Sequence, residues 1–327
     1  MTASAGARPR ALVILAAGKG TRMKSDLPKA LHDIAGRPLV GHVCAACLPL
    51  AREGARLRVV VGAGPDGERV AAAARPAEPV VQPEQHGTGH AVALAIEGLG
   101  AEGTLWVLNG DTPLVPTELL RRLGQEIEER GAAAALVSAE VARPTGFGRV
   151  VRDSAGAFAA VVEERDATPE ERAIREINAG PYAFDLAALR DVIGRLGSVN
   201  AQGEVYLTDA FGLFVRAGRR VGVVRADDAA SVRGINSQDE LAAATDAYHA
   251  RRLVELGRSG VVLDGARGVR VDAPARVLPG ARLGAAVEIL GQSVVQGSAV
   301  VESGARLRDT LVREGARVAG AWIEGAR

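Results

Sequence analysis

The sequence predicts an α/β protein with a mostly parallel sheet, followed by a short parallel β-helix. Two patterns carry this prediction. In the first two-thirds of the 327 residues, short apolar runs alternate with helical patterns, which is typical of a parallel sheet flanked by helices. From about Gly260, apolar residues recur every six positions with a glycine near each, and a hexapeptide period is typical of a parallel β-helix.

The alternating region divides into recognisable elements. It predicts strands at residues 11–15, 57–61, 104–108 and 134–141, and helices at residues 38–52, 88–99 and 117–130. Short strands at 150–152 and 158–163, joined by a turn at 154–156, predict an inserted hairpin. A long helix at 237–256 leads to the last segment. We therefore expect a sheet domain at 1–236, a linker helix at 237–258 and a β-helix at 259–327.

The hexapeptide register is the clearest pattern in the chain. Its apolar positions are Val271, Val277, Leu283, Ile289, Val295, Val301 and Leu307, and the spacing then shortens to Val312, Val318 and Ile323. An ordinary antiparallel sheet is the alternative, but simple alternation would not hold a six-residue phase.

Composition excludes several classes of protein. The formal net charge is +1, so we expect neither a nucleic-acid interface nor a polybasic membrane anchor. The first apolar run, residues 11–17, is too short for a secretory signal or a membrane span. With only two cysteines in addition, the sequence predicts a cytoplasmic protein.

The two cysteines, Cys44 and Cys47, form a C-x-x-C pair inside a predicted helix. A redox pair or half of a zinc site is one interpretation. No second cysteine pair exists to complete a zinc site, so we favour two buried thiols that act as small apolar side chains.

The lysines are unusually placed. Of 40 basic residues only Lys19, Lys24 and Lys29 are lysine, and all three lie within eleven positions. An ammonium group is a compact point charge, whereas guanidinium is a broad planar fork. A crowded phosphate site could require the former, although chance clustering is the alternative.

A glycine-rich loop, LAAGKGTRM (15–23), directly follows the first strand. Gly18 and Gly20 let backbone N–H groups approach an anion, and Lys19 and Arg22 add positive charge. The loop matches neither the Walker A pattern nor G-x-G-x-x-G. It predicts a triphosphate-binding loop of another type, with a plain turn as the alternative.

Further motifs follow in order and carry a specific resemblance. In SDLPK (25–29), Pro28 stiffens the chain before Lys29. Residues 15–29 resemble the signature of bacterial sugar-phosphate nucleotidylyltransferases, most closely the GlmU family, which makes UDP-N-acetylglucosamine. The same resemblance extends through QPEQHGTGH (82–90), NGD (109–111), PTGFGR (144–149), Glu163, EINAG (176–180), NAQGEVYLTD (200–209), Asn236 and the hexapeptide tail.

The resemblance implies a Rossmann-like nucleotidylyltransferase domain, a left-handed β-helix and a homotrimer formed through that helix. It implies UTP and N-acetylglucosamine 1-phosphate as substrates, Mg²⁺ as cofactor, and a place in cell-wall precursor synthesis. The implied nucleotide contacts are Leu15, Ala16, Ala17, Gly18, Gln82, Gly87 and Thr88; the phosphate contacts are Arg22 and Lys29; the magnesium ligands are Asp111 and Asn236; the amino-sugar contacts are Gly148, Glu163, Asn178, Tyr206 and Thr208.

The residue types agree with these roles. Asp111 follows a strand, where a carboxylate can reach the crevice, and Mg²⁺ takes oxygen ligands. The alternatives are a turn residue for Asp111, a helix N-cap region for Asn236 and a solvated loop residue for Gln82. An amide suits a pyrimidine edge because it carries a donor and an acceptor side by side.

Two histidines flank the GTG segment, and a catalytic base is one interpretation of His86 or His90. The attacking phosphate monoester has a second pKa of about 6 and is already largely dianionic at pH 7. We therefore favour structural roles for both.

Some features depart from the family pattern. These are Asn109, His86 and Ala179, which bear on fine substrate preference. The family's second activity, acetylation of glucosamine 1-phosphate, is placed by the resemblance in later coils, and residues 260–327 contain no histidine or lysine. We expect acetyltransferase activity to be absent from this chain. Another sugar-phosphate nucleotidylyltransferase with a thymidylyl or guanylyl donor, or a hexapeptide scaffold or acyltransferase, remains as an alternative.

Overall fold

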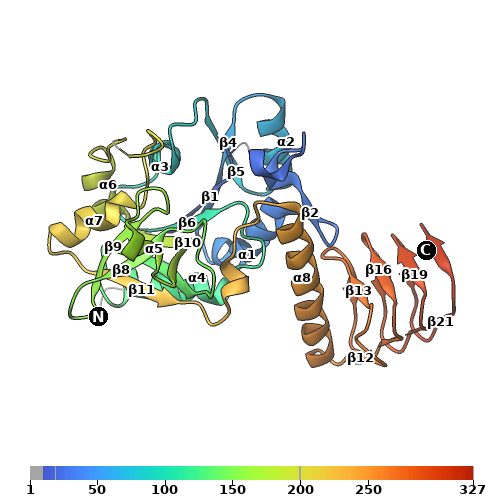
Figure 1. Ribbon diagram of the computed structural model, residues 1–327. Helices are drawn as coiled ribbons and strands as arrows, with labels where there is room; N and C mark the ends of the chain where they lie inside the picture. Colours follow the sequence, from blue (N-terminus) through green and yellow to red (C-terminus); the bar gives the residue numbers. More distant parts are fainter. Residues whose placement is uncertain (1–9, 19, 199, 327) are drawn as a thin grey trace, which may run out of the picture. The chain divides into compact units, whose positions relative to one another are not determined.

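The computed structural model describes residues 10–18, 20–198 and 200–326. The chain forms two compact units: Met1–Leu31 with Leu39–Asn236, and His32–Pro38 with Ser237–Arg327. The first unit contains an α/β sheet, and the second contains a parallel β-helix (Figure 1). No sequence pattern indicated that residues 32–38 group with the second unit.

The first unit is built on a nine-stranded sheet. Its main path runs in the order β11 (Val221–Arg225), β7 (Ala134–Glu140), β10 (Glu176–Asp185), β6 (Thr104–Asn109), β1 (Arg10–Leu15), β4 (Arg56–Gly62) and β5 (Glu78–Gln82). All neighbours on this path pair in parallel except β10, which is antiparallel to β6 and β7. The predicted mostly parallel sheet is confirmed.

The predicted hairpin is also present. β8 (Arg149–Arg152) and β9 (Phe158–Val162) pair antiparallel, and β8 joins the sheet through β10. Asp153 Oδ1 accepts hydrogen bonds from the backbone N–H groups of Ala155 and Ala157, which closes the turn between the two strands. The hairpin places the residues that follow β9 beside the sheet.

The strand order changes direction at β1. The chain moves from β1 to β4 and β5 on one side, then returns to β6 on the other side. Such a switch leaves a crevice at the carboxyl ends of the strands, where ligands bind in open α/β sheets. Leu15 at the end of β1 is the register partner of Asn109 at the end of β6, so both strands open into that crevice.

Alternate side chains of the strands face two cores. In β1, Leu12 and Ile14 face one core, and Ala11 and Val13 face the other. Helices α1 (Leu39–Arg52), α2 (Pro65–Ala73) and α4 (Thr117–Glu128) contribute to the first core; α3 (Thr88–Ala95), α6 (Leu186–Ile193) and α7 (Asp209–Arg216) contribute to the second; α5 (Pro169–Arg172) is a single turn after β9.

Helix α1 settles the question of the two cysteines. Cys44 and Cys47 are both buried thiols of the first core that form no disulfide, and the Cys44 thiol donates to the Ala74 carbonyl at 3.1 Å. Burial raises the pKa of the Cys47 thiol, which makes it a poor nucleophile. The prediction of buried thiols is confirmed.

The elements predicted from sequence need correction, since α6, α7 and β11 were also not predicted. Helix α3 ends at Ala95 rather than at residue 99, because Gly98 follows with a φ of +68° that a helix does not continue through. Helix α2 and strand β5 were not predicted, although Gly64 and Pro65 mark the start of α2. Strand β10 was missed because Gly180 and Pro181 interrupt it.

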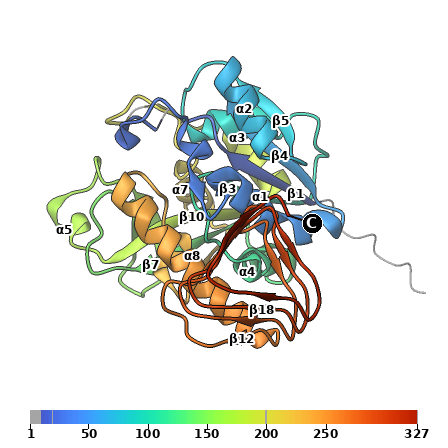
Figure 2. The ribbon, with the colours of Figure 1, turned by 90° about the vertical axis from the view of Figure 1, so that its right-hand side faces the viewer.

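The second unit winds into a β-helix with three flat faces, which Figure 2 shows as a triangular coil. One face contains β12 (Val262–Leu263), β15 (Arg282–Leu283), β18 (Val300–Val301) and β21 (Arg317–Val318); the second contains β13 (Arg270–Val271), β16 (Glu288–Leu290), β19 (Arg306–Arg308) and β22 (Trp322–Glu324); the third contains β14 (Arg276–Val277), β17 (Val294–Val295) and β20 (Leu311–Val312). All of these neighbours pair in parallel.

The six-residue register corresponds to the buried axis of this coil. Every apolar position from Val271 to Leu307 in the predicted series is at most 7% exposed. Val277 pairs with Val295, but Val295 pairs with Val312, so the coil loses one residue where the sequence period shortens. The predicted β-helix is confirmed.

The long helix α8 (Gln238–Arg258) belongs to the same unit. Its Leu253 and Leu256 join the apolar core of the β-helix. The small hairpin of β2 (Asp33–Ile34) and β3 (Arg37–Pro38) also attaches here, since Ala273 N–H donates to the Ala35 carbonyl at 2.7 Å. None of the helices in the described ranges is long and apolar enough to cross a membrane.

Candidate active site

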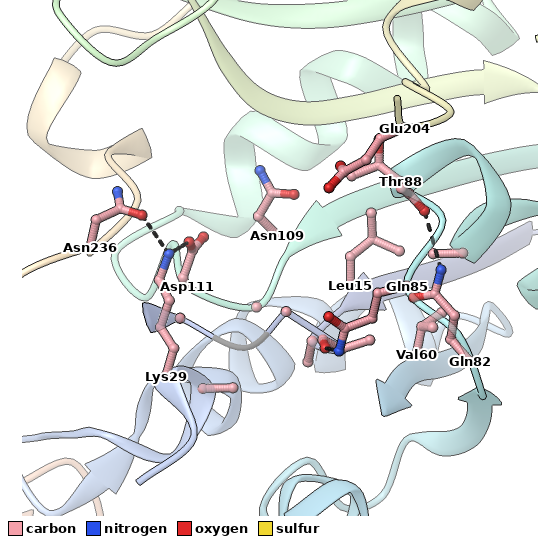
Figure 3. Close-up of a pocket in the computed structure, with 18 of the residues that line it drawn as sticks. Leu15, Lys29, Val60, Gln82, Gln85, Thr88, Asn109, Asp111, Glu204 and Asn236 are labelled. Carbon is pink, nitrogen blue, oxygen red and sulfur yellow. Dashed lines mark hydrogen bonds and ion pairs between the residues drawn. The ribbon is translucent and has the colours of Figure 1, made fainter. Parts of the chain in front are cut away.

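A cavity of about 370 Å³ lies at the carboxyl ends of β1 and β6 (Figure 3). Its walls include the glycine-rich loop after β1, the loop between β5 and α3, and the end of β6. Many of the residues predicted from sequence line it, namely Leu15, Ala16, Ala17, Gly18, Arg22, Lys29, Gln82, Gly87, Thr88, Asp111 and Asn236. The structure therefore brings the predicted nucleotide, phosphate and metal residues to one cavity.

A compact polar cluster occupies one end of this cavity. Lys29 begins the short 3₁₀ helix Lys29–Leu31, and its Nζ donates to Asn236 Oδ1 at 2.6 Å and forms an ion pair with Asp111. Arg22 Nη2 donates to the same Asn236 oxygen at 2.8 Å. Figure 3 shows the Lys29 ammonium between the Asp111 and Asn236 side chains. Two cations and two oxygen-bearing side chains are thus concentrated at one point.

Gly20 makes room for the Lys29 side chain. Gly20 has a φ of +63°, and a Cβ at this position would lie 2.3 Å from Lys29 Cβ. Both the backbone conformation and the contact therefore require glycine. Lys19, which the sequence predicts to add charge to this loop, lies outside the described residues.

The same cluster carries oxygen atoms of the kind that bind a divalent cation. The oxygens of Asp111 and Asn236 converge on one positive atom, Lys29 Nζ, and Ile235 N–H donates to the Asp111 carbonyl at 3.0 Å, which holds the two segments together. Carboxylate and amide oxygens are ligands of hard cations such as Mg²⁺. In the described ranges, no group of three or more His, Cys, Asp or Glu side chains converges, so phosphates and water would complete the shell. The residues present fit such an ion.

The opposite end of the cavity holds a fixed amide. Gln82, at the end of β5, is only 3% exposed. Its Nε2 lies 3.2 Å from the Gly87 carbonyl oxygen and 3.2 Å from His90 Nδ1. The end of the cavity away from the Lys29 cluster therefore presents a side chain suited to hydrogen bonding with a heterocycle.

Three hydrogen bonds join the loop between β5 and α3 to a segment far along the chain. Val205 N–H donates to the His86 carbonyl at 2.8 Å, and Gly89 N–H donates to the Val205 carbonyl at 2.8 Å. Leu207 N–H donates to Thr88 Oγ1 at 3.0 Å. Gly87 has a φ of +104°, and a Cβ there would lie 2.5 Å from the Val205 oxygen, so this approach also requires glycine.

The predicted amino-sugar residues do not line this cavity. Gly148, Glu163, Asn178, Tyr206 and Thr208 instead form a second group. Thr208 Oγ1 donates to Glu163 Oε1 at 3.2 Å, and Asn178 N–H donates to the Gly148 carbonyl at 2.8 Å. Tyr206 and Thr208 flank Leu207, which is bonded to Thr88, so this group adjoins the cavity through the backbone.

Glu163 has an unusual environment within this second group. Burial raises the pKa of its carboxyl, and the nearby carboxylates of Asp166 and Asp209 raise it further, whereas the Thr208 hydrogen bond lowers it. Gly148 lies directly beside it, because a Cβ on Gly148 would be 3.2 Å from Glu163 Oε2. A ligand hydroxyl that donates to Glu163 would replace part of its lost hydration.

Three further residues with polar side chains line the cavity and were not predicted as contacts: Gln85, Asn109 and Glu204. Gln85 Nε2 donates to the Ala17 carbonyl at 2.5 Å and braces the glycine-rich loop. The turn that carries Glu204 is held by Asn200, whose Nδ2 donates to the Glu204 carbonyl at 2.6 Å. All three lie inside motifs quoted above, so position within a motif was the available signal.

The histidines take different positions. His86 is exposed and pairs with Glu84 at 2.8 Å. His90 does not line the cavity and contacts Gln82. Neither histidine contacts the Lys29 cluster in the described hydrogen bonds and ion pairs, which agrees with the structural roles favoured from sequence.

Comparison with known proteins places the chain in a family. Residues 12–178 match the model of the MobA-like NTP transferase domain. The bifunctional protein GlmU of Thermobifida fusca is 45% identical over 318 residues, which cover 95% of this chain and 65% of that protein. GlmU of Streptomyces avermitilis is 42% identical over 318 residues, with the same coverage.

A third relative, GlmU of Streptomyces coelicolor, is 40% identical over 326 residues, which cover 98% of this chain and 67% of that protein. The chain thus spans 65 to 67% of the length of these three relatives. The residues matched by the domain model include the glycine-rich loop, Lys29, Asp111 and Gln82. The chain belongs to the GlmU family, and its sheet unit carries a MobA-like NTP transferase domain.

Proposed function

We propose that the protein is a uridylyltransferase that converts UTP and N-acetylglucosamine 1-phosphate to UDP-N-acetylglucosamine and pyrophosphate. The observation that carries this proposal is the cluster of Arg22, Lys29, Asp111 and Asn236 at the end of the glycine-rich loop, in a cavity whose far end holds the fixed amide of Gln82. Membership of the GlmU family supports it.

The reaction is an in-line displacement at the α-phosphorus of UTP. A phosphate oxygen of the sugar phosphate forms a bond to this phosphorus, and the bond to the bridging oxygen of the leaving pyrophosphate breaks. The attacking phosphate needs no base because it is largely dianionic at neutral pH. Catalysis then depends on positioning the two anions and stabilising the charge that develops between them.

The residues of the cluster are suited to that task. The Arg22 guanidinium and the Lys29 ammonium supply positive charge beside the backbone of the loop. We assign Mg²⁺ to Asp111 and Asn236, where it would neutralise phosphate charge. The Lys29 side chain is only 15% exposed, so its charge acts in a medium less polar than water.

The sugar phosphate is assigned to the second group of residues. Glu163 would accept from a sugar hydroxyl, and Asn178 and Thr208 would supply further polar contacts. Gly148 leaves space beside the Glu163 carboxyl. These assignments follow the family resemblance, and the proximity of Thr208 to Thr88 through Leu207 supports a sugar site that adjoins the nucleotide cavity.

A donor and acceptor panel tests the proposal. Purified protein is given UTP, CTP, dTTP or GTP with N-acetylglucosamine 1-phosphate or glucose 1-phosphate, and pyrophosphate release is measured with and without EDTA. We expect the highest kcat/KM for UTP with N-acetylglucosamine 1-phosphate, and loss of turnover with EDTA that Mg²⁺ restores. A clear preference for dTTP or GTP would refute the uridylyl assignment, and absence of pyrophosphate would refute nucleotidyl transfer.

We also propose that the β-helix unit associates as a homotrimer. Its faces are flat, and Trp322 on one of them is 59% exposed. Flat faces of this kind favour closed cyclic assemblies. Light scattering coupled to size exclusion should give three times the 33.7 kDa chain mass, and a monomer at micromolar concentration would contradict the proposal.

A further inference from the structure

We propose that His90 is a positioning residue that fixes the amide of Gln82, so that the carbonyl oxygen of this amide faces the nucleobase. The proposal rests on the uridylyl transfer proposed above and extends it to the way in which the donor base is selected. His90 itself lies outside the cavity lining, as the third residue of α3, and acts only through Gln82.

The first step concerns the orientation of the Gln82 amide. One of its two terminal atoms lies 3.2 Å from the Gly87 carbonyl oxygen. A backbone carbonyl can only accept a hydrogen bond, so the atom that faces it must be the NH₂ group. This assignment follows from the chemistry of the partner and does not depend on distinguishing oxygen from nitrogen by shape.

The second step concerns the tautomer of His90. The same NH₂ group lies 3.2 Å from His90 Nδ1. Because an amide NH₂ offers only donors, Nδ1 must accept, and the neutral imidazole therefore carries its proton on Nε2. Both N–H bonds of Gln82 are then directed at protein acceptors, the Gly87 carbonyl and His90.

The third step concerns what remains for a ligand. Gln82 lines the cavity, and its Oε1 receives no hydrogen bond from the part of the chain that the structure describes. The only hydrogen-bonding function left for a bound base is thus an acceptor. Uracil and thymine present an N3–H donor at this edge, whereas N3 of cytosine is an acceptor and would face Oε1 with its lone pair. The geometry favours uracil and thymine over cytosine.

The role of His90 is to make this orientation costly to reverse. To offer its NH₂ group to cytosine, the Gln82 amide must turn over, which sacrifices the bonds to both Gly87 and His90. One neutral hydrogen bond changes an equilibrium by about two- to tenfold. Removal of His90 leaves only the Gly87 carbonyl to hold the amide, so selection against cytosine should weaken by a factor in that range.

The test compares three variants. His90→Leu removes the acceptor, and His90→Asn keeps an acceptor close to the position of Nδ1. Glu84→Gln is the matched control, because Glu84 lies in the same loop, is exposed and pairs with His86 rather than with Gln82 or His90. For each protein we would measure kcat/KM with UTP and CTP, the dissociation constants of both nucleotides by calorimetry, and the melting temperature.

We expect His90→Leu to lower the UTP-to-CTP ratio about fivefold, with His90→Asn close to wild type and Glu84→Gln unchanged. An unchanged ratio in a folded His90→Leu protein overturns the proposal, and so does an equal loss in the Leu and Asn variants. The ratio of the UTP and CTP dissociation constants tests the orientation of Gln82 independently of catalysis. If wild type releases no pyrophosphate, the proposed function fails while the binding ratios still test His90. If wild type binds UTP no more tightly than CTP, the orientation proposal fails.

Discussion

Lys29 Nζ lies 2.6 Å from Asn236 Oδ1, although 207 positions separate the two residues in the chain. The same ammonium pairs with Asp111, so one lysine joins the glycine-rich loop, the end of β6 and the segment before α8. Because its two partners are also the proposed metal ligands, the charge of Lys29 and that of a bound cation act on the same oxygens. Substitutions at this point of the site should therefore affect turnover more than folding.

Asp111→Asn should remove most activity with little effect on stability. The variant retains size and polarity but loses the anionic metal ligand, and we expect turnover to fall by about a hundredfold. The free energy of unfolding should change by no more than about 1 kcal/mol, since the new amide oxygen can still accept from Lys29 and Lys29 keeps its bond to Asn236. Turnover against Mg²⁺ concentration, with thermal melting alongside, checks this. Asp191→Asn, an exposed change on α6, is the control; near-normal turnover in Asp111→Asn would contradict the metal assignment.

Lys29→Arg should be poorly tolerated although it keeps the charge. The Lys29 stem packs against Gly20 and its Nζ is held between Asp111 and Asn236, an arrangement that suits a compact ammonium better than a wider guanidinium. We expect kcat/KM to fall at least about tenfold, or about 1.4 kcal/mol of barrier. Lys24→Arg, five positions earlier at an exposed site, should have no such effect. Equal rates for Lys29→Arg and wild type would show that shape is unimportant here.

Gly20→Ala should impair activity more than it impairs folding. The positive φ alone costs about 1–2 kcal/mol for a residue with a Cβ, and the contact with Lys29 Cβ adds displacement of that side chain. Gly131→Ala is a matched control, with a φ of +65° and no atom within 4 Å of the new Cβ. Both variants should lose similar stability in urea, but only Gly20→Ala should lose turnover. Similar turnover in the two variants would show that the approach of Gly20 to Lys29 is not needed for activity.

Glu163→Gln should stabilise the protein at neutral pH while it weakens sugar binding. Burial raises the folded-state pKa of Glu163 above its unfolded value of about 4.3. Protonation therefore favours the folded state, and the contribution of this group is most favourable below pH 4.3 and is lost as the pH rises through the folded-state pKa. The variant should melt higher than wild type at pH 8, with the difference vanishing towards pH 4.

Melting curves between pH 4 and 8 measure this effect, and Glu102→Gln, an exposed change, supplies the baseline. The KM for the sugar phosphate should rise in Glu163→Gln with a smaller change for UTP. A pH-independent difference in melting temperature would contradict the assigned effect of burial.

Much of the architecture could be predicted because it repeats. The β-helix has one buried position every six residues, and Val271, Leu283 and Ile289 mark this spacing directly in the amino-acid sequence. Strand β1 could be predicted because it is buried on both faces and reads as a continuous apolar run. In both cases the local pattern and the tertiary burial carry the same information.

Other elements could not be predicted because tertiary contacts define them. In β10 the register shifts between Asn178 and Tyr182, where Gly180 has a φ of +95° and Pro181 has no N–H to donate. Sequence patterns treat such residues as the end of a strand. The neighbours β6 and β7 hold the strand together across the bulge, and they are distant in sequence.

The candidate site likewise contains residues that the sequence could predict and residues that it could not. Motif resemblance identified Lys29, Asp111 and Gln82, and the structure brings all three to one cavity. It did not indicate that Glu204 would line the same cavity, because that depends on the approach of residues 204–207 to the loop before α3. Nor did the motif indicate that His90 would contact Gln82, since this contact joins the end of β5 to α3 and depends on how the two are folded together.

The hydrogen bonds of Thr88, Gly89 and Val205 have a thermodynamic consequence for the order of substrate binding. They make the nucleotide loop and the segment that carries Tyr206 and Thr208 a single mechanical element. A nucleotide that immobilises the first segment lowers the entropy that the sugar phosphate must remove from the second, so the two ligands should bind with positive cooperativity. By linkage, the factor by which UTP tightens the sugar phosphate equals the factor by which the sugar phosphate tightens UTP.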